Sequence, residues 1–162
     1  MQRPDSASAR AQLVKIIGDC VYHAIGLKET LEEERKALEE QDMTALSAAI
    51  DDKTKCVDEL RLGEQQRTDL CAAAGFSAGP EQMDQMIQWC DEDSAVSNCW
   101  QHLIGIAVDC DRLNVSNGQI IRGRQQQIES SISVLRGEPQ LHTYGHSGKE
   151  PRGHALRTIA EA

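Results

Sequence analysis

The chain has 162 residues, which suits a single domain, and a formal net charge of −9. An acidic chain argues against nucleic-acid binding, because displacing counterions from phosphates requires a cationic surface. Aromatic residues make up only 3% of the sequence, which is typical of thin helical assemblies and unusual for the thick core of a compact enzyme. The sequence has no run of about 18 apolar residues to span a bilayer and no apolar signal core near its start. We therefore expect a cytoplasmic protein without membrane insertion.

A long first helix is expected over residues 6–41, where no proline or turn cluster occurs. Its apolar residues recur at spacings of three and four: Leu13, Ile17, Cys20, Ala24, Leu27, Leu31 and Leu38. Glu34 is the one polar residue in this register. Such a heptad-like stripe predicts a helix that packs nearly antiparallel to its neighbours.

A second helix should begin after Asp42, whose side chain can cap it. It should end at a run of alanines followed by Gly75, with the apolar Phe76 folding back over the helix end. Its apolar positions are Leu46, Ile50, Val57, Leu60, Leu70 and Cys71. Lys53, Glu64 and Arg67 interrupt this stripe, so we expect the middle of the helix to be less buried than its ends. The link to the first helix is short, and it favours an antiparallel hairpin over a kinked continuation.

The segment Ser77–Pro80 is the clearest break in the body of the chain, and Pro80 suits the first turn of a short helix. The apolar residues of this short helix are Met83, Met86, Ile87 and Cys90. The acidic residues that follow indicate a turn, in which Ser94 is the expected cap of the next helix.

The last helix should run from about Ala95 to Arg136. Its apolar stripe consists of Val96, Cys99, Trp100, Leu103, Ala107, Cys110, Leu113, Ile120, Ile121, Ile128, Ile132 and Leu135. Asn117 falls within this register, and a buried asparagine fixes the register of a bundle with some loss of stability. Gly118 beside it lets another backbone come close.

The tail after the last helix differs from the rest of the chain. Gly137 and Pro139 end the helical pattern, and the residues beyond them are too poor in apolar side chains to build a core. We predict an all-α fold, namely an elongated antiparallel helical bundle or coiled coil of three long helices plus one short helix. The bundle should comprise residues 1–136, and residues 137–162 should form a disordered, flexible tail.

No motif for catalysis, cofactor binding or metal binding is present. The six cysteines lack C-x-x-C spacing, and most fall on or beside apolar helical positions, so we expect reduced, structural thiols. Cys99 and His102 share one helical turn, but a structural cysteine beside an ordinary histidine is the commoner arrangement. We therefore predict a protein that is not an enzyme and has no cofactor.

Several motifs resemble the FlgN family of flagellar type III export chaperones, over roughly residues 10–148. The last helix carries Asn114-x-x-Asn117-Gly118 followed by Ile120-Ile121, and the tail carries Leu141-x-Thr143-Tyr144-Gly145-x-x-Gly148. Weaker matches are Gln41-Asp42, the second-helix positions Lys53, Leu60, Arg67, Leu70 and Gly75, and the helix end Leu135-Arg136-Gly137.

The resemblance implies a chaperone that binds the hook–filament junction proteins FlgK and FlgL through their C-terminal segments. It would prevent their premature assembly and deliver them to the flagellar export gate protein FlhA, with the export ATPase as a further contact. The alternative is a general coiled-coil scaffold or oligomerisation module without a role in export. Whether the free chain is a monomer or a homodimer is left open by the sequence.

Two sets of site residues follow. The apolar face of the last helix and the asparagine–glycine motif predict a cargo-binding set: Asn117, Gly118, Ile120, Ile121, Arg124, Ile128, Ile132 and Leu135. The alternative is that these isoleucines pack on the chain's own first helix. For docking to the export gate, the family pattern points to Leu141, Tyr144 and Gly145.

Overall fold

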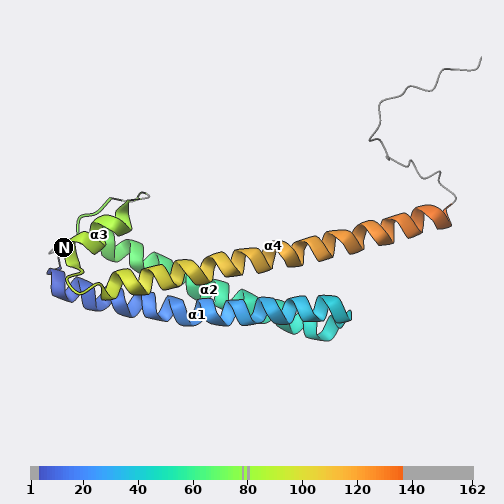
Figure 1. The fold of residues 1–162 in the computed structure, drawn as a ribbon, viewed down its shortest axis with the longest axis horizontal. Helices are drawn as coiled ribbons and strands as arrows, with labels where there is room; N and C mark the ends of the chain where they lie inside the picture. Colours follow the sequence, from blue (N-terminus) through green and yellow to red (C-terminus); the bar gives the residue numbers. More distant parts are fainter. Residues whose placement is uncertain (1–3, 78, 80, 137–162) are drawn as a thin grey trace, which may run out of the picture. The chain divides into compact units, whose positions relative to one another are not determined.

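A computed structural model describes residues 4–77, 79 and 81–136, which form helices without any strand. The helices are α1 (Ser6–Glu40), α2 (Met43–Ala73), α3 (Gln82–Cys90) and α4 (Ala95–Leu135), as Figure 1 shows. The predicted all-α fold, with three long helices and one short one, is confirmed. The chain divides into two compact units, residues 1–125 and 126–162. The described part of the second unit is residues 126–136, most of which continue α4.

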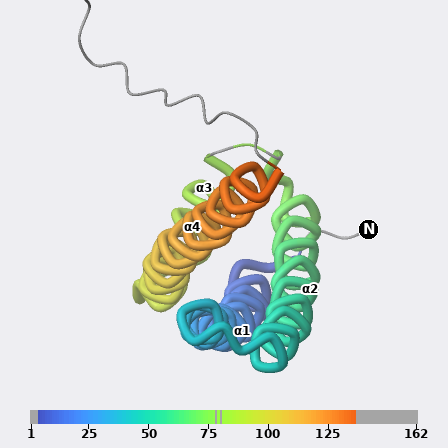
Figure 2. The backbone as a smooth tube through the Cα atoms, turned by 90° about the vertical axis from the view of Figure 1, so that its right-hand side faces the viewer, coloured from blue at the N-terminus to red at the C-terminus, as the bar shows by residue number. Residues whose placement is uncertain are grey.

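Two local capping interactions turn the chain between α1 and α2. Gln41 adopts a left-handed conformation with φ 61°, and the Asp42 amide donates to the Ala37 carbonyl at 3.0 Å. The Asp42 carboxylate accepts from the amides of Thr44 at 2.9 Å and Ala45 at 3.0 Å. Figures 1 and 2 show α1 and α2 side by side along their lengths. Both the predicted cap and the antiparallel hairpin are confirmed.

Glycines allow α1 and α2 to approach closely. A Cβ atom added at Gly63 of α2 would lie 2.3 Å from the Cys20 Sγ of α1. At Gly26 of α1, an added Cβ would lie 3.5 Å from the Cys56 Sγ of α2. The first distance is far shorter than a van der Waals contact, so the α1–α2 contact requires glycine at residue 63.

Replacing Gly63 with alanine should therefore lower the free energy of unfolding by about 1–2 kcal/mol, because overpacking outweighs the gain in helix propensity. The Cys20 side chain is buried and has few helical rotamers with which to move away. Urea unfolding of the variant measures the loss.

Gly18→Ala is the matched control, since an added Cβ there meets nothing within 4 Å. It should raise the free energy of unfolding by about 0.5–1 kcal/mol. The double variant Cys20→Ala/Gly63→Ala should recover part of the stability. Equal effects of Gly63→Ala and Gly18→Ala would show that the close approach is not a constraint.

All four helices contribute to one apolar core near the start of α1. Its buried members are Ala9, Leu13 and Ile17 of α1, Leu70, Cys71 and Ala74 at the end of α2, Met83, Met86 and Cys90 of α3, and Val96 of α4. Gly75, with φ 91°, turns the chain so that the Phe76 amide donates to the Cys71 carbonyl at 3.0 Å. Phe76 then packs on this core with its ring 5.6 Å from that of Trp89. The predicted fold-back of an apolar residue over the end of α2 is confirmed.

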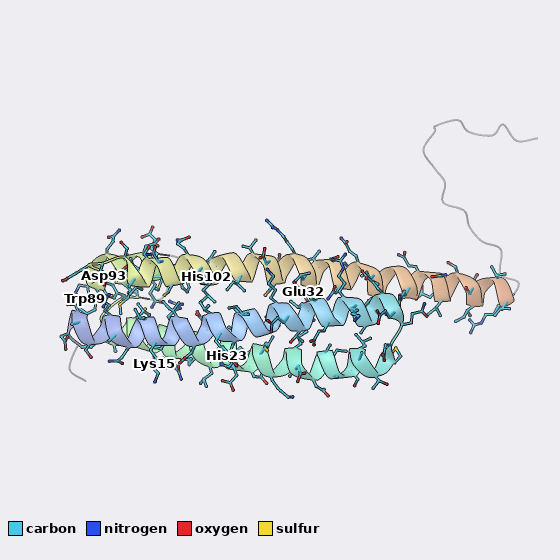
Figure 3. All side chains as sticks on the ribbon, turned by 60° about the horizontal axis from the view of Figure 1, so that its bottom comes forward. Lys15, His23, Glu32, Trp89, Asp93 and His102 are labelled. Atoms are coloured by element: carbon cyan, nitrogen blue, oxygen red, sulfur yellow. The ribbon has the colours of Figure 1, made fainter. Side chains whose placement is uncertain are left out.

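The start of α4 is capped by two aspartates rather than by the predicted serine. Asp91 accepts from the amides of Val96 at 3.1 Å and Ser97 at 2.9 Å, and Asp93 accepts from Ala95 at 3.2 Å. The prediction that Ser94 caps α4 was wrong, because Ser94 takes a left-handed φ of 63° and the aspartates bind the free amides. Figure 3 shows Trp89 and Asp93 at this end of the bundle, close to the start of α1.

The core becomes thinner along α1 away from α3. A second apolar cluster joins Ala24 and Leu31 of α1 to Ile106 and Cys110 of α4, with Leu60 of α2 only partly buried against it. Leu70 and Cys71 at the C-terminal end of α2 are buried, whereas Val57 and Leu60 in its middle are half-buried, as predicted for that end. At the start of α2 the prediction was wrong, because Leu46 is only half-buried and Ile50 is exposed.

Two predicted core positions were wrong. Ile50 is 47% exposed, and Ala107 is also exposed. The neighbouring residues Ala49 and Ile106 are buried instead. Ala49 and Ile106 each lie one residue earlier on their helices, a step of about 100°, and this position rather than the predicted one faces the bundle.

Candidate functional site

The thinning of the core leaves a groove between α2 and α4, with α1 as its floor. Next to α3, the groove holds a cavity of about 250 Å³. Among its lining residues are Ile16 and Cys20 of α1, Leu60 of α2, and Trp100, Leu103 and Ile104 of α4. In the end-on view of Figure 2, α2 and α4 stand on either side of α1. We call this feature the α2–α4 groove.

Further along, the groove continues through two more cavities. A cavity of about 210 Å³ lies over Leu27 and Leu31 of α1, with Val57 on one side and Cys110 on the other. Lys53 and Asn114 line both this cavity and a third cavity of about 300 Å³. The α2–α4 groove is thus apolar near α3 and becomes polar toward the asparagine–glycine motif.

Arg67 bridges the two sides of the groove at its apolar end. Its guanidinium carbon lies 5.4 Å from the centre of the Trp100 ring on α4, a cation–π geometry. The same guanidinium binds Glu64 on α2 at 2.7 and 2.8 Å. This hydrogen-bonded pair lowers the pKa of Glu64 and raises the pKa of Arg67, so both side chains stay charged at neutral pH.

A buried polar cluster connects the three long helices at the other end of the groove. Glu34 of α1 is 4% exposed, and its two carboxylate oxygens accept from Lys53 Nζ of α2 at 3.1 and 3.3 Å. Lys53 also donates to Asn114 Oδ1 of α4 at 2.9 Å. Asn117 Nδ2 of α4 donates to the Leu31 carbonyl at 2.9 Å and to Glu34 Oε2 at 2.7 Å.

Glu34, Lys53 and Asn117 each interrupt the apolar stripe of a different helix. In the fold, Glu34 forms hydrogen bonds with both of the others. Asn117 is 1% exposed, which confirms its predicted burial. Because each partner is a specific hydrogen-bonding group, a shift of one helix along another would leave buried polar atoms unpaired. The cluster therefore fixes the register of the three helices.

The predicted cargo-binding residues fall in both units. Within residues 1–125, Gly118, Ile120 and Arg124 are half-buried, and Ile121 is 39% exposed. Arg124 also donates to the Glu39 carbonyl at 3.4 Å. In the second unit, the apolar members of the set are all exposed: Ile128, Ile132 and Leu135. Their contact with cargo remains a prediction, and Leu141, Tyr144 and Gly145 lie outside the described residues.

Sequence reasoning missed most of the groove lining. Leu60 and Trp100 were read as ordinary members of apolar stripes, yet both line the groove. The sequence spacing of these two residues indicates that their side chains face inward. It does not indicate whether another helix covers them. The local signal that could have indicated the site is the set of polar interruptions, because charged residues on an apolar stripe need a buried partner.

The part of the chain that the structure describes has no cluster of three or more metal-ligating side chains. All six cysteines are free, and His102, the neighbour of Cys99, is exposed on α4 (Figure 3). Burial raises the pKa of four of the thiols, those of Cys20, Cys71, Cys90 and Cys110.

Alkylation by iodoacetamide should reflect this burial. The thiolate is the reactive form, so a raised pKa leaves less of it at neutral pH, and the rate increases only as the pH approaches the raised value. Cys56 and Cys99, which are half-buried, should be labelled first, and the four buried thiols only slowly. Mass spectrometry of the folded chain, compared with labelling in urea, tests this. Equal labelling of all six thiols in the folded chain would contradict the burial.

Comparison with known protein families identifies the family of this chain. The family model described as FlgN protein matches residues 9–152. The chain belongs to the FlgN family. This is a family of flagellar export chaperones and not of enzymes, in agreement with the resemblance of the asparagine–glycine and tail motifs. No curated protein and no solved structure shows significant similarity to this FlgN-family chain. Within the described ranges, none of its helices is long and apolar enough to cross a membrane.

Proposed function

We propose that this FlgN-family chain acts in the cytoplasm as an export chaperone whose α2–α4 groove binds one amphipathic helix of its cargo. The observation that carries the proposal is the incomplete bundle. At one end α3 packs with the other three helices, while further along, among residues 4–77, 79 and 81–136, only α1, α2 and α4 remain around the groove. An amphipathic helix that lays its apolar face in such a groove is a common mode of peptide recognition.

The cargo is the C-terminal segment of the hook–filament junction proteins FlgK and FlgL. A helix that runs beside α4 from Trp100 to Asn117 needs about 17 residues at 1.5 Å per residue. Its apolar side chains would cover half-buried groove residues such as Leu60 and Leu103, and covering the assembly segment would prevent premature polymerisation. In the second unit, Ile128 and Ile132 are exposed, and we assign to them a separate apolar contact with the cargo.

Delivery uses a different part of the chain. We assign docking on the export gate protein FlhA to Leu141, Tyr144 and Gly145, with the export ATPase as a further contact. The sequence of this segment supports the assignment, because it carries an aromatic anchor among residues with no apolar stripe. Separate regions for cargo and gate would let the chaperone hold one partner while it meets the other.

The test is calorimetric titration of the full chain with synthetic C-terminal segments of FlgK and FlgL. Ile104→Glu places a carboxylate in the groove, and desolvating it under a bound helix should weaken binding at least about tenfold. Ile25→Glu is the matched control, because Ile25 is 42% exposed against 40% for Ile104 and lines none of the groove cavities. Equal affinities of the two variants would refute binding in the groove.

A further inference from the structure

The α2–α4 groove contains two recesses of similar size. The first recess is the cavity of about 250 Å³ next to α3, and the second recess is the cavity of about 210 Å³ over Leu27 and Leu31. Among the residues that the structure describes, the two share no lining residue, and each takes its walls from all three long helices. An apolar cavity of about 150 Å³ is large enough to hold a benzene ring. Each recess therefore has room for one large apolar side chain.

The buried lining of both recesses favours an apolar side chain. Cys20 in the first recess and Leu31 in the second are buried residues of α1. The polar lining of the second recess lies nearer to solvent, because Asp111 and Asn114 are exposed on α4 and Lys53 is paired with a carboxylate. A side chain that enters either recess would remove apolar surface of the groove from water, which is favourable only if the side chain is apolar as well.

The two recesses repeat along the helices with a spacing of eleven residues. Residues of the first recess can be matched to residues of the second on each long helix, always at this spacing. The matched pairs are Ile16 with Leu27 and Cys20 with Leu31 on α1, Trp100 with Asp111 and Leu103 with Asn114 on α4, and Glu64 with Lys53 on α2. Eleven residues of an α-helix make about three turns and rise by about 16.5 Å.

We infer that the groove recognises a cargo helix by two large apolar side chains eleven residues apart, one in each recess. A bound helix has the same rise as the helices that form the groove, so its side chains at positions i and i+11 reach both recesses. These two side chains differ in direction by only about 20°, and they face the groove together. The identity of the cargo rests on the proposed function, whereas the spacing of its two anchors rests on the recesses.

A different spacing on the same helix face does not fit. Side chains seven residues apart also differ in direction by about 20°, but they are separated by only about 10.5 Å along the helix. A helix with this spacing can place one anchor in a recess and must leave the other on the wall between the two. Spacing therefore distinguishes recognition by two recesses from general attraction to an apolar groove.

The first test needs no flagellar protein. Two alanine-rich helical peptides of identical composition carry two phenylalanines, either eleven or seven residues apart, and each is titrated into the full-length chain. We expect the peptide with eleven-residue spacing to bind at least about tenfold more tightly, because it buries one more large side chain. Equal affinities, or binding of neither peptide, would overturn the inference.

A variant of the chain places the preference in the groove. Ala107 lines the first recess and is exposed, so Ala107→Phe puts a ring at the recess without changing the core. The preference for eleven-residue spacing should then disappear. Val108→Phe is the matched control, since Val108 is 45% exposed and is not among the residues that line either recess. It should keep the preference. An unchanged preference in Ala107→Phe would contradict the assignment of an anchor to the first recess.

The last test uses the cargo segments. Each large apolar residue of the C-terminal segments of FlgK and FlgL is replaced in turn by alanine, and binding to the unaltered chain is measured. Two positions eleven residues apart should each weaken binding at least about tenfold. If the sensitive positions have another spacing, the two-anchor inference is refuted while the chaperone function stands. If neither segment binds, the cargo assignment fails, and the model peptides still decide the spacing.

Discussion

Lys53→Met should lower the free energy of unfolding by about 2–3 kcal/mol. The substitution leaves the Glu34 carboxylate buried without its cationic partner, and breaking a buried ion pair in this way usually destabilises by 3–5 kcal/mol. We expect the lower figure because the Lys53 side chain is 28% exposed, so that water can reach the site. Chemical unfolding monitored by circular dichroism measures the change.

Lys55→Met provides the matched control, because Lys55 pairs with Asp52 on the same helix but is 75% exposed. Exposed pairs contribute little, so its effect should stay within about 0.5 kcal/mol. The triple variant Glu34→Met/Lys53→Met/Asn117→Leu should be about as stable as the natural chain, since apolar residues can replace a buried ionic cluster without loss. A small effect of Lys53→Met would show that Glu34 does not depend on this pair.

Tyr144→Ala should sharply reduce secretion of the junction proteins while cargo binding stays unchanged. Burying a large side chain contributes about 1.5–3 kcal/mol, so its loss should weaken gate docking by roughly tenfold to a hundredfold. Secretion by cells that carry the variant, together with calorimetry of the purified chain and cargo segment, separates the two activities.

The other tyrosine gives the control for this experiment. Tyr22 is 75% exposed on α1 and lines none of the groove cavities, so Tyr22→Ala should change neither secretion nor cargo binding. Loss of cargo binding in Tyr144→Ala would mean that the tail takes part in holding cargo, and the division between cargo and gate regions would be wrong.

The helices could be predicted from the sequence because their signals are local. Asp42 caps α2 as its position indicates, and Phe76 folds back over the end of α2 after a glycine. The stripes also identified most of the core. Where they failed, at Ile50 and Ala107, the preceding residue is also apolar and faces the bundle instead, and apolar spacing alone does not distinguish the two.

The buried polar cluster could not be predicted from the apolar stripe of any single helix. Glu34, Lys53 and Asn117 were each recognisable as interruptions, but their contact requires the relative register of three helices. The groove was less predictable still. A half-buried residue such as Leu103 has the same sequence spacing as a fully buried one. The sequence therefore indicates that its side chain faces inward but not that it lacks a covering helix.

In the proposed complex, a cargo helix occupies the position beside α1 that α3 fills at one end of the bundle. Methyl NMR of isoleucine-labelled chain with the C-terminal segment of FlgK tests it most directly. Large shifts are expected for Ile16 and Ile104 in the groove. No shift is expected for Ile25, which is nine residues from Ile16 and therefore on the opposite face of α1. Binding that leaves Ile16 and Ile104 unchanged, or that moves only Ile128 and Ile132, would contradict it.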